Sequence, residues 1–131
     1  MAQENHCIAL NNDVMIPQIG FGVFQVEDGP QTVDAVRTAL EDGYRHIDTA
    51  SVYGNEASVG KAIAESDVDR ADLFVTTKLW NDDIRKRRTK DAFQESLDRR
   101  GLDYVDLYLI HWPAEGWQEA WAAMQELYAQ G

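Results

Sequence analysis

The sequence lacks several features that mark common protein classes. Its 131 residues contain a single cysteine, Cys7, so a disulfide within the chain is excluded and a reducing cytoplasm is the expected compartment. No segment approaches the ~20 apolar residues that span a bilayer, and the polar residues 1–12 lack the apolar core of a secretion signal. Positive charge is also scarce. With 12 Lys and Arg against 23 Asp and Glu, the net charge of −11 argues against nucleic acid as a partner.

The composition is nevertheless that of a folded chain. Hydrophobic residues make up 44% of the sequence and aromatic residues 10%, which is more apolar side chain than disordered proteins carry. The length falls within the usual range of one domain, and no linker or low-complexity run divides the chain. We therefore expect residues 1–131 to form a single unit.

Apolar periodicity predicts a hairpin followed by strands and helices in alternation. The hairpin covers residues 7–16, with its turn at residues 11–13. The expected strands are residues 19–23, 44–48, 73–77 and 105–110, and the expected helices are residues 31–42, 55–65, 89–100 and 116–130. Each helix supplies the crossover that two parallel strands require, so the pattern predicts an α/β fold of four strand–helix units.

Four parallel strands form either a small open sheet or half of an eight-stranded (β/α)8 barrel. A doubly wound, nucleotide-binding sheet needs a glycine-rich turn that opens directly into a helix. Residues 20–25 hold two glycines of that pattern but lack the third, and no helix is expected to begin there. The half-barrel is therefore the favoured fold class.

The last expected helix carries a stripe of large side chains, formed by Trp117, Trp121, Met124 and Tyr128. Such a stripe serves either as an aromatic binding surface or as a face that packs on the protein core. Core packing is the commoner use of a helical apolar stripe. We therefore interpret these residues as packing against the sheet.

Three strand-like runs each end at an ionisable side chain, namely Asp48, Lys78 and His111, and Tyr53 follows the first of them by five residues. Taken alone, each has a simpler explanation, such as a turn cap, a surface aromatic, a solubilising charge or a buried histidine. The carboxyl ends of parallel strands meet at one rim of a barrel, where barrel enzymes place their chemistry. This common placement favours a shared site. The three histidines show no metal-ligand spacing, so no metal site is expected.

These four side chain types together suit the donation of a proton. A free phenol has a pKa of about 10 and is a weak acid near neutrality, but a nearby ammonium lowers that pKa. A carboxylate paired with the ammonium offsets part of its desolvation. Tyr53 thus fits the role of general acid, Lys78 tunes it, Asp48 holds Lys78, and His111 orients a carbonyl oxygen that becomes negative as hydride arrives.

Residues 43–50 (Gly-Tyr-Arg-His-Ile-Asp-Thr-Ala) and 53–56 (Tyr-Gly-Asn-Glu) resemble the signature of the aldo-keto reductases. Residues 73–80 and 106–113 resemble two further motifs of that family, and the likeness extends over nearly the whole chain. The residues in these motifs are similar to those of the bacterial branch that includes diketogluconate and methylglyoxal reductases. The resemblance implies a (β/α)8 TIM barrel that binds NADPH without a Rossmann domain and reduces aldehydes or ketones to alcohols.

The resemblance also implies roles for individual residues. By motif position, Tyr53 is the catalytic acid, Lys78 and Asp48 are its partners, and His111 orients the substrate. The remaining implied positions are Phe24, Trp80, His111 and Trp112 for binding a small carbonyl substrate, and Gly22, Val23 and Asp48 for binding the cofactor.

Family members run to roughly twice this length. We therefore expect residues 1–131 to be the N-terminal half of such a barrel, whether as a natural truncation, a fragment or an engineered half. Most cofactor contacts are then implied to lie in the other half. A half-barrel leaves two open sheet edges, so we expect self-association or a complementing C-terminal half. Two functions stay open: an NADPH-dependent carbonyl reductase, and a catalytically silent half-barrel that acts as a structural or assembly unit.

Overall fold

A computed structural model describes residues 6–131 of the protein. The chain begins with a hairpin and continues as alternating strands and helices. In order, the elements are β1 (Cys7–Ala9), β2 (Met15–Pro17), β3 (Phe21–Gly22), α1 (Pro30–Glu41), β4 (His46–Asp48), the 3₁₀ turn η1 (Ser51–Tyr53), α2 (Glu56–Glu65), the 3₁₀ turn η2 (Arg70–Asp72), β5 (Phe74–Leu79), α3 (Asn81–Arg85), α4 (Thr89–Arg100), β6 (Leu107–Ile110) and α5 (Trp117–Ala129).

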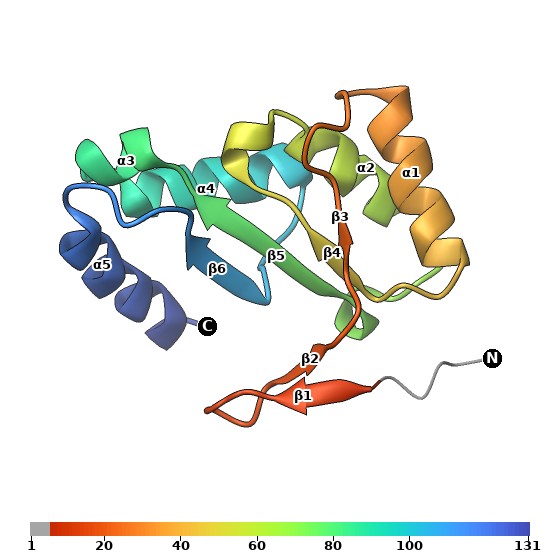
Figure 1. The fold of residues 1–131 in the computed structure, drawn as a ribbon, viewed down its shortest axis with the longest axis horizontal. Coiled ribbons are helices and arrows are strands. Elements are labelled where there is room, and N and C mark those ends of the chain that lie inside the picture. Colours follow the sequence, from red (N-terminus) through yellow and green to blue (C-terminus); the bar gives the residue numbers. More distant parts are fainter. Residues whose placement is uncertain (1–5) are drawn as a thin grey trace.

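The four strands β3, β4, β5 and β6 pair in parallel in that order, and β1 and β2 form a separate antiparallel hairpin. Figure 1 shows α1, α2 and α4 running along one side of the sheet, with the hairpin at the end where the strands begin. Since neighbours in the sheet are also neighbours in the chain, each intervening helix is a crossover, as in half of a barrel.

The strands send alternate side chains to opposite faces of the sheet. Ile47, Val75 and Leu79 are fully buried on the face that the helices cover. Asp48 and Lys78 lie on the other face. His46 and Thr76, two residues earlier in the same strands, share that face. One face thus forms the hydrophobic core, and the other carries polar groups at its carboxyl end.

The element boundaries differ from the predicted ones in ways that pairing explains. β3 is only two residues long, because only Phe21 and Gly22 pair with β4, opposite Ile47 and Asp48. β5 extends through Lys78 to Leu79, since both residues pair with β6. The short helix α3 was not predicted, because its five residues are too few to show a helical period.

The interpretation of the α5 stripe was wrong for its aromatic members. Trp117, Trp121 and Tyr128 are 42%, 55% and 73% exposed, while the buried side chains of α5 are Ala120 and Met124. Ala120 and Met124 belong to the buried cluster that includes Leu79 and Ile84, so they, and not the aromatic side chains, form the side of α5 that packs on the core. Within the described range, every helix is too short or too polar to traverse a bilayer.

Candidate active site

The ends of β4 and β5 bring a carboxylate and an ammonium to one face of the sheet. Asp48 closes β4 opposite Thr76, so Lys78, two residues further along β5, shares its face. The Nζ of Lys78 lies 3.0 Å from Oδ1 and 2.9 Å from Oδ2 of Asp48. The lysine side chain is 14% exposed and the aspartate side chain 35%, so the pair is shielded but open on one side.

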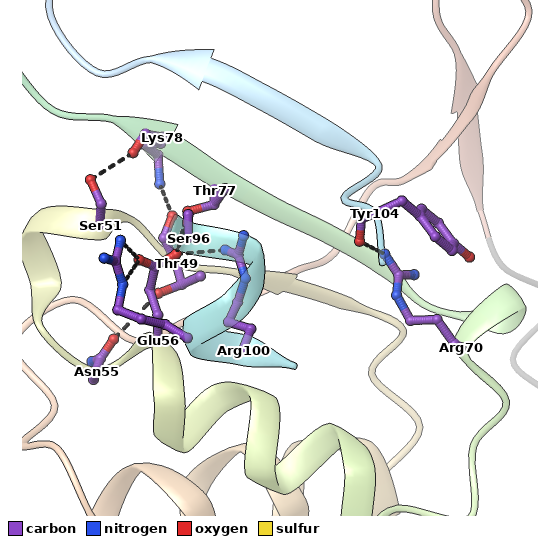
Figure 2. A network of polar contacts seen from close by, with 11 residues as sticks. Thr49, Ser51, Asn55, Glu56, Arg70, Thr77, Lys78, Ser96, Arg100 and Tyr104 are labelled. Carbon is purple, nitrogen blue, oxygen red and sulfur yellow. Dashed lines mark hydrogen bonds and ion pairs between the residues drawn. The ribbon is translucent and has the colours of Figure 1, made fainter. Parts of the chain in front are cut away.

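Lys78 has three N–H donors and a partner for each of them. Besides binding Asp48, Nζ donates to the main-chain oxygen of Thr49 at 2.9 Å, a bond seen in Figure 2. Nζ also lies 3.4 Å from the hydroxyl oxygen of Tyr53. The carboxylate and the carbonyl therefore fix the ammonium, and its remaining N–H faces the phenol.

The 3₁₀ turn η1 carries Tyr53 back over the end of β5. Its main-chain N–H donates to the carbonyl of Ala50 at 3.1 Å. The hydroxyl of Ser51 donates to the main-chain oxygen of Lys78 at 3.1 Å, as Figure 2 shows. Because Ser51 and Tyr53 belong to the same turn, this bond sets the position of the tyrosine relative to the lysine. Gly54 follows with φ 71°, a left-handed conformation that glycine adopts without strain.

His111 directly follows β6 and completes the polar group. Its main-chain N–H donates to the carbonyl of Leu79 at 3.1 Å. Its ring lies edge-on to the rings of Tyr53 and Trp80, with centres 6.0 and 5.2 Å apart. Nδ1 is buried and has no hydrogen-bond partner among residues 6–131. Burial, and then the positive charge of Lys78, lowers the pKa of His111 from 6.5, so the neutral imidazole is favoured.

Three aromatic side chains border these polar groups. The ring of Phe24 lies 5.2 Å from that of Tyr53, and the ring of Trp112 stacks on His111 at 6.3 Å. Phe24 and Trp112 are largely exposed, while Trp80 is half-buried. The structure thus gathers the residues predicted for substrate binding around one apolar border.

Gly22 and Val23, which were predicted together with Asp48 to bind the cofactor, differ in their exposure. Gly22 is exposed and pairs with Asp48, and a Cβ added there would lie 3.9 Å from Oδ2 of Asp48. Val23 is fully buried in the core, its N–H donates to the carbonyl of Asp48, and its carbonyl accepts from Asn55. Gly22 is therefore accessible to a ligand. The side chain of Val23 is buried, and its N–H and carbonyl both form hydrogen bonds within the protein.

Sequence reasoning assigned no role to several polar residues near Tyr53 whose hydrogen bonds hold the segments around the site. Besides Ser51, these include Asn55, which is fully buried, and Glu56. The Glu56 carboxylate accepts hydrogen bonds from Thr77 and Ser96 and pairs with Arg100, as Figure 2 shows. It also pairs with Arg99. Burying a carboxylate or an amide is costly unless it finds partners. The available signal was a pair of polar residues directly after the Tyr53-Gly54 turn, where an amphipathic helix begins.

The described residues hold no cluster of metal-binding side chains. Among residues 6–131, no group of three or more His, Cys, Asp or Glu side chains is placed to hold a metal ion. His46 points away from the buried Ile47, and its Nε2 lies 2.9 Å from Oγ1 of Thr76 on the inward face. This histidine is therefore part of the packing below the Asp48–Lys78 pair.

The fold and its rim of polar side chains define half of a (β/α)8 barrel with its candidate site at the strand ends. The chain belongs to the Aldo/keto reductase family, whose profile matches residues 18–131. It is 46% identical over 127 residues to the methylglyoxal reductase DkgA of Escherichia coli, an alignment that covers 95% of this chain and 45% of that protein. The predicted bacterial branch is thereby confirmed.

Solved structures confirm the predicted half-barrel. An aldo/keto reductase from Brucella melitensis superposes with a TM-score of 0.92 at 50% identity, over 97% of this chain and 50% of that one. A Bombyx mori aldo-keto reductase, solved in complex with NADP, superposes with a TM-score of 0.85 at 41% identity, over 95% of this chain and 47% of that one. The chain spans about half the length of the curated relatives that it matches.

Proposed function

We propose that this chain is the catalytic N-terminal half of an NADPH-dependent carbonyl reductase, with Tyr53 as the general acid. The proposal is supported above all by Lys78, whose Nζ is bound by Asp48 and lies 3.4 Å from the Tyr53 hydroxyl. Family membership and the NADP complex of the Bombyx mori relative support the reaction class.

In this mechanism each residue acts on one charge or one proton. Tyr53 donates its hydroxyl proton to the carbonyl oxygen of the substrate. The ammonium of Lys78 stabilises the negative charge left on the phenol oxygen, and Asp48 holds that ammonium in place. His111, kept neutral by burial, has Nδ1 in the interior, so Nε2 is the ring nitrogen left to donate to the same carbonyl oxygen.

The borders of the site suit a substrate with an apolar or sugar-derived body next to its carbonyl group. Phe24, Trp80 and Trp112 provide flat apolar surface on the side of the site where Tyr53 and His111 lie. Apolar walls with a few convergent polar groups are typical of small-molecule sites. We therefore propose aldehydes, ketones and keto-sugars as the substrate class.

The residues present fit the reacting end of the cofactor. Gly22 leaves an open surface beside the half-exposed Asp48, and these two residues are proposed to hold the nicotinamide end. Bound NADPH supplies the hydride. Since the matched relatives are about twice as long, we propose that the remaining contacts come from the second half of a barrel, in the same chain, in a second copy or in a complementing chain.

NADPH consumption with a panel of aldehydes, ketones and keto-sugars tests the proposal. The assay is run on this chain with and without the second half of the barrel. We expect turnover with the complete barrel. Tyr53→Phe is expected to lower turnover at least ~10²-fold, since general acids contribute about that much or more, while NADPH still quenches tryptophan fluorescence. Tyr128→Phe, at an exposed tyrosine of α5, is the matched control.

The outcomes separate the two candidate functions. A complete barrel that neither binds NADPH nor reduces any carbonyl would leave the silent structural unit as the function of this chain. A complete barrel that turns over equally well with Tyr53→Phe would remove Tyr53 from its role while keeping the reaction class.

A further inference from the structure

Asn55 is a buried amide that joins three segments around the site. Its side chain is fully buried at the start of α2. Nδ2 donates to the main-chain carbonyls of Val23 and Val26, each at 3.0 Å, and Oδ1 accepts from the hydroxyl of Thr49 at 3.3 Å (Figure 2 shows the pair with Thr49). All three bonds link α2 to segments that border the Asp48–Lys78 pair.

The segment that Asn55 holds carries Phe24. This side chain is 65% exposed and has little core packing to hold it, yet its ring lies 5.2 Å from the ring of Tyr53. The next residue, Gln25, has φ 62°, a left-handed conformation that is unfavourable for a residue with a side chain. Such a conformation persists only where the surroundings impose it.

The two carbonyls bound by Asn55 lie on either side of Phe24 and Gln25. Val23 immediately precedes them and Val26 immediately follows, and the N–H of Val26 also donates to the carbonyl of Val23 at 3.1 Å. A single amide group therefore closes this loop at both ends. Without it, the carbonyl of Val23 loses its side-chain donor and the carbonyl of Val26 keeps only the Thr32 hydroxyl, at 3.5 Å. The strained turn that presents Phe24 is then free to relax.

We propose that Asn55 is a positioning residue of the substrate pocket, whose amide holds residues 23–26 so that Phe24 stays against Tyr53. The inference rests on the proposed function, because it assigns Phe24 to the wall of the pocket. Asn55 touches neither substrate nor the reacting atoms and acts through Phe24.

Steady-state kinetics of the complete barrel test the role. Asn55→Ala is expected to raise KM for the carbonyl substrate about tenfold, because two hydrogen bonds that order the pocket wall are lost, with a smaller change in kcat. Thr49→Val keeps the Asn55 side chain and removes only the bond that orients it, so it provides a milder variant if Asn55→Ala fails to fold. Its KM is expected to rise less.

Ser58→Ala is the matched control. Ser58 is also a buried residue of α2, and its hydroxyl accepts from the N–H of Gly29 and donates to Asp28, beyond the part of the loop that carries Phe24. The Ser58→Ala variant is expected to keep KM within about twofold of wild type, even if the lost hydrogen bonds lower the stability of the fold.

A double-mutant cycle distinguishes positioning from general stability. In a Phe24→Ala background, Asn55→Ala is expected to change KM less than about twofold, because the side chain that it positions is gone. Equal KM effects of Asn55→Ala with and without Phe24 would overturn the proposal. So would an unchanged KM in the single variants.

Amide hydrogen exchange gives a readout that does not depend on activity. We expect residues 23–26 to exchange faster in Asn55→Ala and Thr49→Val than in wild type or Ser58→Ala. If the wild-type barrel reduces no carbonyl, the proposed function fails. The exchange measurement then tests by itself whether Asn55 holds the loop in place. Unchanged exchange in residues 23–26 would then overturn the inference.

Discussion

Lys78 and Asp48 face each other across two neighbouring parallel strands, and Nζ of the lysine lies within 3.0 Å of both carboxylate oxygens. The pairing register sets this meeting, since Asp48 lies opposite Thr76 and strand alternation returns Lys78 to the same face. The ion pair then presents one N–H to Tyr53. The proposed chemistry depends on this relationship.

Replacing Lys78 tests the electrostatic part of the site. Lys78→Met keeps a similar chain length but removes the ammonium beside the Tyr53 hydroxyl, so the charge left by proton transfer loses its partner. We expect turnover of a complete barrel to fall at least ~10²-fold. Lys61→Met, at an exposed lysine of α2, is expected to leave turnover unchanged. Near-normal NADPH consumption in Lys78→Met would contradict the mechanism.

The titration of His111 provides a second test. Burial and the charge of Lys78 lower its pKa below 6.5, so the unfolded chain binds more protons than the folded protein between the two values. The resulting contribution to stability is present above pH 6.5 and is lost as pH falls through the lowered pKa. NMR titration of the ring protons is expected to show the lowered pKa, and Lys78→Met is expected to raise it. An unmoved titration in Lys78→Met would show that the two charges do not interact.

The same lysine provides an internal comparison at His46. The pKa of His46 is also lowered, mainly by burial, and the charge of Lys78 contributes least to that shift. Lys78→Met is therefore expected to shift the titration of His46 less than that of His111. Equal shifts of both histidines would instead indicate a general loosening of the sheet.

Glu56 ties α2 to α4 and β5 through a buried charge network. Its carboxylate pairs with Arg100, and both side chains are at most 1% exposed. Glu56→Gln removes the charge at nearly constant shape and leaves Arg100 buried without a counter-charge, which we expect to cost about 3 kcal/mol or more. Glu119→Gln breaks the exposed pair with Arg87 and is expected to cost at most ~1 kcal/mol. Denaturant unfolding compares them, and equal losses would contradict the assigned role of burial.

Gly60 tests the close approach of α2 and α4. A Cβ at this position would lie 2.0 Å from the main-chain oxygen of Arg100, a backbone atom that no side-chain rotation can move. Helix propensity alone predicts that Gly60→Ala stabilises by ~1 kcal/mol. We expect the opposite, a net loss of about 2 kcal/mol, because overpacking separates the helices. Ala64→Gly, at an exposed position of α2, measures the propensity term, and a more stable Gly60→Ala would show that the helices can part freely.

Much of the fold was readable from local pattern. The alternation of apolar strands with amphipathic helices predicted the parallel sheet and the hairpin, and Val59 and Ile63 of α2 face the core as their spacing indicates. Residues at strand ends, including Asp48 and His111, were found because parallel strands share one rim. These features depend on residues near one another in the chain, so the sequence carries them directly.

Other features depended on partners that are distant in the chain. The aromatic stripe of α5 was assigned to the core, yet Trp121 and Tyr128 are largely exposed, because the neighbours of a helix decide which side of its apolar face is covered. Ser51 and Asn55 gave no periodic signal. Ser51 acts through one contact to a strand, and Asn55 holds a loop through two contacts, all to residues more than 25 positions away.

The order of strands and helices, the family and the identity of the polar residues at the rim were determined by the sequence itself, because periodicity and motif are local properties. The tertiary structure decided which atoms meet: that one N–H of Lys78 faces Tyr53, that Val23 lies in the core, and that Asn55 closes the loop bearing Phe24. Distances of this kind follow from strand register and side-chain packing, which join residues that the sequence keeps apart.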